Sequence, residues 1–190
     1  MAERLKNMRE VLILAGIEEI NAHGVTEFSI RRVAGNCNIS CAAPYKHFKD
    51  KRDFIAAIID YVNEQWHVRQ QEVLSRCGSS FREQILEVSI HYIRFLMEKP
   101  FYRSILMLKD AEFDNIYHKV RGQLSSRSQQ LERDFFAGVT WDSVTQRRKL
   151  HLVRSIIFGT VFMFDSGEFE YNDETMEFVR HNIDREFDLP

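Results

Sequence analysis

The chain has 190 residues and a mass of 22.5 kDa, enough for one domain or for a small domain attached to a larger one, which excludes large multidomain machinery. Hydrophobic residues make up 44% of the sequence and charged residues 28%, a composition typical of a soluble globular protein and not of a disordered or fibrous one. The three cysteines form no Cys-x-x-Cys pair, so we expect neither a disulfide framework nor a paired zinc site, and a reducing, cytoplasmic location. The longest apolar run, residues 155–164, is too short for a bilayer that needs about 20 residues, so no membrane span is expected.

The charge is unevenly distributed along the chain. The overall net charge is −2, but residues 28–52 carry a local net charge of +5, so the remainder carries −7. A compact basic segment suits a phosphate backbone, because each neutralised phosphate releases counterions; a solvated basic helix face explains the same pattern equally well. The charged residues in question are Arg31, Arg32, Lys46, Lys49, Lys51 and Arg52, opposed only by Asp50.

One helix followed by two short helices is predicted at the N-terminus. Apolar residues recur at helical spacing over residues 3–22, and Gly24 supplies a C-terminal stop. Ser29 is a good N-cap for a second helix over residues 30–34. Asn38 tolerates a left-handed backbone, and Ser40 can cap a third helix over residues 41–48. The sequence therefore predicts short helices joined by tight turns in this segment.

The rest of the chain is also predicted to be helical. Apolar periodicity and cap signals, among them Asp50 and Asp142, indicate six further helices over residues 50–75, 81–99, 101–108, 113–136, 144–165 and 173–187. No segment shows the alternation of a strand, and no repeat is present. The predicted fold class is therefore all-α, with about nine helices.

A spaced pattern across some 45 N-terminal residues resembles the tetracycline-repressor (TetR) family of bacterial transcription regulators. The chain departs from the family pattern where Asn38 replaces the usual glycine and Pro44 replaces the usual aliphatic residue. Asn is the next best residue for a left-handed turn, whereas Pro44 removes one helical hydrogen bond and can bend the helix. The residues that carry the resemblance are Ala15, Ile17, Ile20, Gly24, Ser29, Val33, Ala34, Ile39, Ser40, Tyr45, Lys46, His47, Phe48 and Lys51.

The resemblance implies a helix-turn-helix DNA-binding domain over residues 1–49. Such a motif lays its second helix in the major groove, where base edges distinguish all four pairs. Core packing is the better interpretation for Phe48, and for Arg32 and Arg52 a surface salt bridge is at least as good as a DNA contact. By resemblance, the expected contacts to double-stranded DNA are Arg31, Cys41, Ala42, Ala43, Tyr45, Lys46, His47 and Lys51, with His47 and Lys51 at phosphate-contacting positions.

The resemblance further implies that residues 50–190 sense a ligand and dimerise. The segment 150–164 is apolar around its whole circumference, so we expect a homodimer built from the last two long helices. Two-fold symmetry then implies a palindromic operator. A small, apolar or aromatic effector is expected among the middle helices, with candidate contacts His91, Tyr92, Phe95, Tyr102, Tyr117, Phe158 and Phe162.

Other functions remain open at this point. A helix-turn-helix adaptor that acts through a protein partner, without an inducer, is the main alternative to a ligand-responsive repressor. A metal-carboxylate enzyme in a helical bundle is a remote one, since it needs two Glu-x-x-His motifs and the sequence shows only Glu64–His67. No catalytic motif is recognisable, so no catalytic residue, metal or cofactor is predicted.

Overall fold

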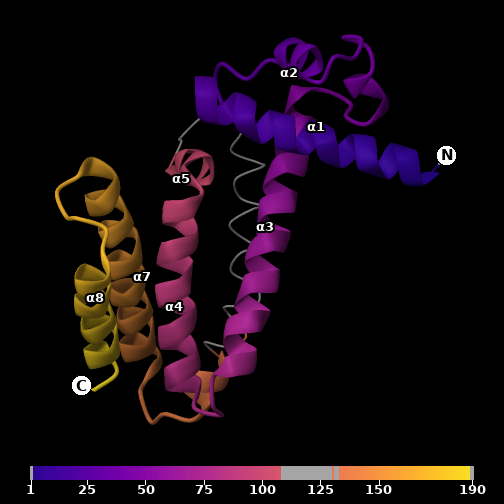
Figure 1. Cartoon of the computed structure of the whole chain (residues 1–190). Coiled ribbons are helices and arrows are strands. Elements are labelled where there is room, and N and C mark those ends of the chain that lie inside the picture. The colour runs from indigo at the N-terminus through magenta and orange to yellow at the C-terminus, as the bar shows by residue number, and fades with distance from the viewer. Residues whose placement is uncertain (1, 108–129, 131–132, 189–190) are drawn as a thin grey trace. The chain divides into compact units, whose positions relative to one another are not determined.

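The computed structural model describes residues 2–107, 130 and 133–188. All regular structure in these residues is helical, which confirms the all-α prediction (Figure 1). The chain divides into two compact units: Met1–Gln65 with Lys99–Gln123, and Trp66–Glu98 with Leu124–Pro190. The helices are α1 (Ala2–His23), α2 (Ile30–Asn36), the 3-10 helix η1 (Pro44–Lys46), α3 (Lys51–Arg76), α4 (Phe81–Glu98), α5 (Pro100–Met107), α7 (Ser143–Ser166) and α8 (Asp173–Glu186).

The first unit packs α1, α2 and the N-terminal part of α3 around an aromatic core. The ring of Phe54 from α3 stacks on Phe48 at a centroid distance of 3.9 Å and meets Phe28 edge-on at 5.3 Å. All three rings are buried, and Leu12 and Ile20 of α1 are buried with them. The core thus joins the segment after η1 to the start of α3, which fixes the base of the segment predicted to read DNA.

The second unit places α4, α7 and α8 side by side (Figure 1). Asp142 caps α7 by accepting a hydrogen bond from the backbone N–H of Thr145 at 2.7 Å, as the sequence predicts. Asn172 caps α8 in the same way through Thr175, at 2.9 Å. In the described residues no helix is long and apolar enough to cross a bilayer.

Two of the predicted helices, those over residues 41–48 and 113–136, are not observed over most of their length in the described residues. Residues 41–48 do not form a helix: they form a turn followed by the single 3-10 turn of η1, so that prediction is wrong. The cause is Pro44, which has no N–H to donate to the carbonyl of Ser40 and so removes the first α-type bond. The predicted helix over residues 113–136 lies almost wholly outside the described residues, although residues 133–137 are helical.

Candidate nucleic-acid interface

The turn that follows α2 is built by backbone hydrogen bonds around Asn38. The N–H of Ile39 donates to the carbonyl of Ala34 at 3.0 Å, and the N–H of Asn38 donates to Gly35, also at 3.0 Å. This pair of bonds is a Schellman motif, in which the residue after the helix cap takes a left-handed conformation. Asn38 does so, with φ of 54°. The sharp turn after α2 therefore forms as the sequence predicts, with Asn in place of glycine.

The segment after this turn presents its side chains to solvent at its tip. Cys41 and Ala42 are exposed, and Ala43 is half-buried. Tyr45 is 57% exposed, a large value for an aromatic side chain, and Lys46 beside it is also exposed. The structure thus brings these five predicted DNA-contacting residues together on one short segment, where four of them are exposed.

The two predicted phosphate contacts follow this segment in the chain. His47 is half-buried against Phe48, with ring centroids 6.3 Å apart. Lys51, the first residue of α3, is half-buried, and its Nζ donates to the backbone carbonyl of Thr26 at 2.8 Å. An ammonium has three N–H groups, so this bond orients the charge and leaves donors for a phosphate.

The N-terminus of α3 is closed by its own carboxylates. Asp50 accepts from the backbone N–H of Asp53 at 2.9 Å, which confirms it as the cap. The carboxylate of Asp53 in turn accepts from the backbone N–H of Lys49 at 2.8 Å. One amide of the first turn, that of Asp53, is therefore already occupied by the cap.

The two arginines of α2 have different surroundings. Arg31 is exposed, as a DNA contact requires. Arg32 instead pairs with the buried carboxylate of Glu19 in α1, its Nε donating at 2.7 Å. The same carboxylate accepts from the backbone N–H of Ser29, at 3.2 Å. Arg32 is thus engaged in fastening α2 to α1, which favours the salt-bridge interpretation of this residue.

Glu19 is the residue of this site that the sequence interpretation missed. It is only 2% exposed, on the buried side of α1 between Leu12, Ile13 and Ile20. An acidic side chain on an otherwise apolar helix face is the signal that could have found it, because a buried charge needs a partner.

The residues predicted to bind an effector are divided between the units. Tyr102 of α5 lies in the first unit, where its hydroxyl donates to Asn63 Oδ1 at 2.5 Å. Tyr92 and Phe95 of α4 lie in the second, with ring centroids 4.8 and 5.3 Å from that of Trp66. Burial raises the pKa of Tyr92 and lowers that of His91, so the His91 imidazole stays neutral at pH 7. Tyr117 lies outside the described residues.

Phe158 and Phe162 differ from Tyr92 and Phe95 in their exposure to solvent. They are 43% and 58% exposed on α7. Other exposed apolar side chains on the same helix and on α8 are Val144, Leu152, Met163 and Phe178. The second unit therefore exposes six large apolar side chains on α7 and α8, a set that we call the apolar face, and one chain alone does not cover them.

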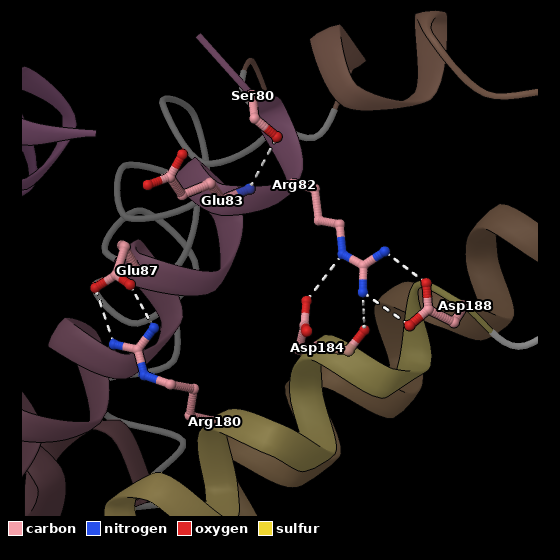
Figure 2. Close-up of polar contacts among 7 residues, drawn as sticks. All are labelled: Ser80, Arg82, Glu83, Glu87, Arg180, Asp184 and Asp188. Carbon is pink, nitrogen blue, oxygen red and sulfur yellow. Dashed lines mark hydrogen bonds and ion pairs between the residues drawn. The ribbon is translucent and has the colours of Figure 1, made fainter. Parts of the chain in front are cut away.

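Ion pairs join α8 to α4 within the second unit (Figure 2). Arg82 of α4 donates to Asp184 at 2.8 Å and to Asp188 at 2.5 and 2.9 Å. One turn and more along α4, Glu87 accepts two hydrogen bonds from Arg180. These pairs hold the two helices in one register, because bidentate arginine–carboxylate bonds are directional.

No group of three or more His, Cys, Asp or Glu side chains in the described residues is arranged to hold a metal ion. Glu64 and His67 share the long helix α3, but no second ligand pair joins them among those residues.

The N-terminal part of the chain and its overall fold are similar to known proteins. Residues 12–58 match the family model of the bacterial regulatory proteins of the tetR family. No curated protein sequence matches the chain significantly. Among solved structures, a TetR family transcription regulator from Marinobacter aquaeolei VT8 is 19% identical, with 98% of each chain covered and a TM-score of 0.73.

Two further solved structures are similar over nearly the whole chain. A regulator of the TetR/AcrR family from Thermobifida fusca is 16% identical, covering 94% of this chain and 97% of its own, with a TM-score of 0.67. The transcriptional regulator FadR from Bacillus subtilis, solved in complex with stearoyl-CoA, is 14% identical, covering 93% and 95%, with a TM-score of 0.75. The chain therefore carries a TetR-family DNA-binding helix-turn-helix domain at residues 12–58 and has, over its length, the fold of the TetR-family transcription regulators.

Proposed function

We propose that the protein is a homodimeric, ligand-responsive repressor that binds a palindromic operator, with residues 1–49 as its DNA-binding domain and residues 50–190 for dimerisation and sensing. The observation that carries the proposal is the short segment after the turn at Asn38, which exposes Tyr45 and Lys46 and is followed by the oriented ammonium of Lys51. Cations beside a reading segment supply phosphate contacts, and the segment itself supplies base contacts. Such a regulator acts by binding in the cytoplasm and needs neither catalysis nor a cofactor.

The apolar face on α7 and α8 supports the dimer. Burying exposed phenylalanines stabilises an interface by about 25 cal/mol for each Å² removed from water. In an isologous dimer the same face meets itself, so Phe158 and Phe162 of one chain would meet the partner's α7 and α8. Two-fold symmetry would then set the two reading segments about 34 Å apart, one turn of DNA, and so select a palindrome.

The effector we propose is small and largely apolar. The cluster of Trp66, Tyr92 and Phe95 in the second unit, with the neutral His91 on the same helix α4, offers aromatic surface and one polar group. The FadR structure holds stearoyl-CoA, a ligand with a long apolar chain, which is consistent with this class. Because Phe158 and Phe162 are exposed, we assign them to the dimer interface ahead of the effector site. Tyr102 and Tyr117 remain candidates by resemblance only.

Effector binding would release DNA by a population shift. A ligand that prefers a different spacing of the two reading segments weakens operator binding by its differential affinity for the two states. Long acyl-CoA thioesters, the corresponding free fatty acids and small aromatic compounds are the ligands to titrate against the operator complex.

Selection of bound fragments from random double-stranded DNA tests the proposal. We expect an enriched palindrome, with a stoichiometry of two chains per site by sedimentation of the complex. Enrichment of an asymmetric sequence bound by one chain would overturn the dimer, and failure to enrich any sequence at low salt would overturn operator binding. Insensitivity of the complex to all three ligand classes, where binding of any of them to the protein is detected, would favour an adaptor.

A further inference from the structure

The reading segment of this protein is organised by a proline. Pro44 is buried at its centre, and its nitrogen carries no proton for the carbonyl of Ser40. That carbonyl accepts instead from the N–H of Ala43 at 2.9 Å. The segment therefore starts with a bond three residues apart in place of the four-residue spacing of an α-helix.

The tighter spacing continues through the residues that face solvent. The N–H of Lys46 donates to Ala43 at 3.1 Å, and the N–H of His47 donates to Pro44 at 2.9 Å. Side chains three apart are superimposed along a 3-10 turn, whereas in an α-helix residues four apart share a face. Lys46 therefore aligns with half-buried Ala43, whereas in an α-helix it would lie between Ala43 and exposed Ala42.

The turn cannot relax easily, because both of its ends are anchored. Phe48, whose N–H donates to Pro44 at 2.9 Å, is buried and stacked on Phe54. Its other face is covered by Arg9, whose guanidinium carbon lies 5.4 Å from the ring centroid. On the opposite side the Schellman turn at Asn38 fixes where the segment begins. The direction of Tyr45 is thus set by backbone bonds and not by its own packing.

We propose that Pro44 is a positioning residue for sequence recognition: it holds the reading segment in a 3-10 turn, which assigns base contact to Tyr45 and phosphate contact to Lys46. Tyr45 offers a hydroxyl that both donates and accepts, and a ring edge that can pack on a thymine methyl. Lys46, turned to the side of the tip, offers a point charge suited to the backbone. This inference rests on the proposed operator binding.

The first experiment compares the full-length protein with Pro44→Ala in selection from random DNA, followed by fluorescence anisotropy on the selected site and on single-base variants. With Pro44→Ala we expect the segment to gain α-type bonds and the preference at one or two positions of each half-site to fall by about tenfold. Pro100→Ala is the matched control, because Pro100 is an exposed first residue of α5. An unchanged preference for Pro44→Ala, with a melting temperature like that of the control, would overturn the proposal.

The second experiment keeps Pro44 and so does not depend on how its variant folds. Tyr45→Phe should relax preference at specific positions, whereas Lys46→Met should weaken binding to all sequences and lower the salt slope by about one. If Tyr45→Phe weakened binding to all sequences and Lys46→Met changed the sequence preference, the assignment of base contact to Tyr45 and phosphate contact to Lys46 would be overturned. If the unmodified protein selects no sequence, the proposed function fails, and that result is distinct from either outcome for Pro44.

Discussion

Arg180 of α8 and Glu87 of α4, 93 residues apart in sequence, are joined by two parallel hydrogen bonds, one of them of 3.0 Å between Arg180 Nη2 and Glu87 Oε2 (Figure 2). Both side chains are largely buried, with 29% and 24% of their surfaces exposed. The bonds from Arg180 hold the pKa of Glu87 below its ordinary value, against an opposing effect of burial. We therefore expect this pair to make the packing of α8 on α4 sensitive to acid.

Glu87→Gln should reduce that sensitivity. A carboxylate with a lowered folded pKa contributes stability that is present above its unfolded pKa and is lost as the pH falls through the folded value. The free energy of unfolding of the wild type should therefore fall more steeply below about pH 4.5 than that of Glu87→Gln, while at pH 7 the variant is less stable by about 1–3 kcal/mol. Urea titrations at pH 7, 5, 4 and 3 measure both effects.

Glu177→Gln is the matched control for this change. Glu177 lies 3.6 Å from Arg180 but is 75% exposed, so solvent screens the pair. We expect its pH profile to follow the wild type. Equal slopes for the wild type and Glu87→Gln would show that the pair does not contribute to acid sensitivity.

The sequence predicts the features that depend on residues close together in the chain, such as helix caps and turns. Asn38, Asp50 and Asp142 act as expected because turns and caps are made with neighbours two to four residues away. For the same reason the burial of Phe48 follows from its place at the end of an amphipathic segment. The prediction of DNA contacts rests on a pattern of this local kind.

Contacts between distant segments do not follow from such patterns. Helical periodicity places Glu19 and Glu87 on particular faces, but it does not state that their partners are Arg32 and Arg180, because those pairings depend on how helices pack. The sequence leaves Phe162 between the effector site and the dimer interface for a related reason: an apolar residue on a helix is equally consistent with a core, a cavity and an interface. Pro44 combines a predictable and an unpredictable feature. The sequence predicts that it removes one helical hydrogen bond, but it does not predict that a 3-10 turn forms in place of the helix.

Asn38 provides a second prediction, about the turn before the reading segment. Because its φ is 54°, Asn38→Gly should keep or slightly raise stability, whereas Asn38→Ala should lower the free energy of unfolding by about 1 kcal/mol. Chemical denaturation of the wild type, Asn38→Gly and Asn38→Ala measures the order of their free energies of unfolding. If alanine were as stable as glycine here, the left-handed turn would not be a requirement.

A third prediction concerns the buried side chain of Lys149 in α7. It is only 2% exposed, and its Nζ donates to the carbonyl of Glu186 at the end of α8 at 2.6 Å. Lys149→Met keeps the aliphatic volume but leaves that carbonyl without its charged donor, and Lys149→Ala also creates a cavity. We expect stability to decrease from Lys to Met to Ala, with a total loss of about 2–3 kcal/mol.

Urea unfolding followed by tryptophan fluorescence measures this series, since the Lys149 ammonium lies 5.4 Å from the ring centroid of Trp141. A methionine variant as stable as the wild type would mean that packing alone accounts for the position, as is found for some buried ion pairs.

Phe162→Glu tests the dimer interface. The ring is 58% exposed in the single chain, so the substitution should leave the fold intact while placing two like charges near each other in an isologous dimer. We expect a monomer by light scattering at micromolar concentration, and at least a hundredfold weaker operator binding. Val68→Glu, at a 52% exposed position on α3, should remain dimeric. A dimeric Phe162→Glu protein would place the interface elsewhere.

Lys51→Ala tests the phosphate contacts apart from sequence reading. The ammonium of Lys51 is oriented by the Thr26 carbonyl at 2.8 Å, so its loss should weaken binding to operator and random DNA by a similar factor. Each phosphate contact contributes about one unit to the slope of log affinity against log salt, per reading segment. Anisotropy titrations from low to moderate salt should therefore show a shallower slope for Lys51→Ala and an unchanged one for Arg76→Ala, an exposed cation in the last turn of α3. Equal slopes for Lys51→Ala and the wild type would remove Lys51 from the DNA contacts and leave the Thr26 bond as its whole role.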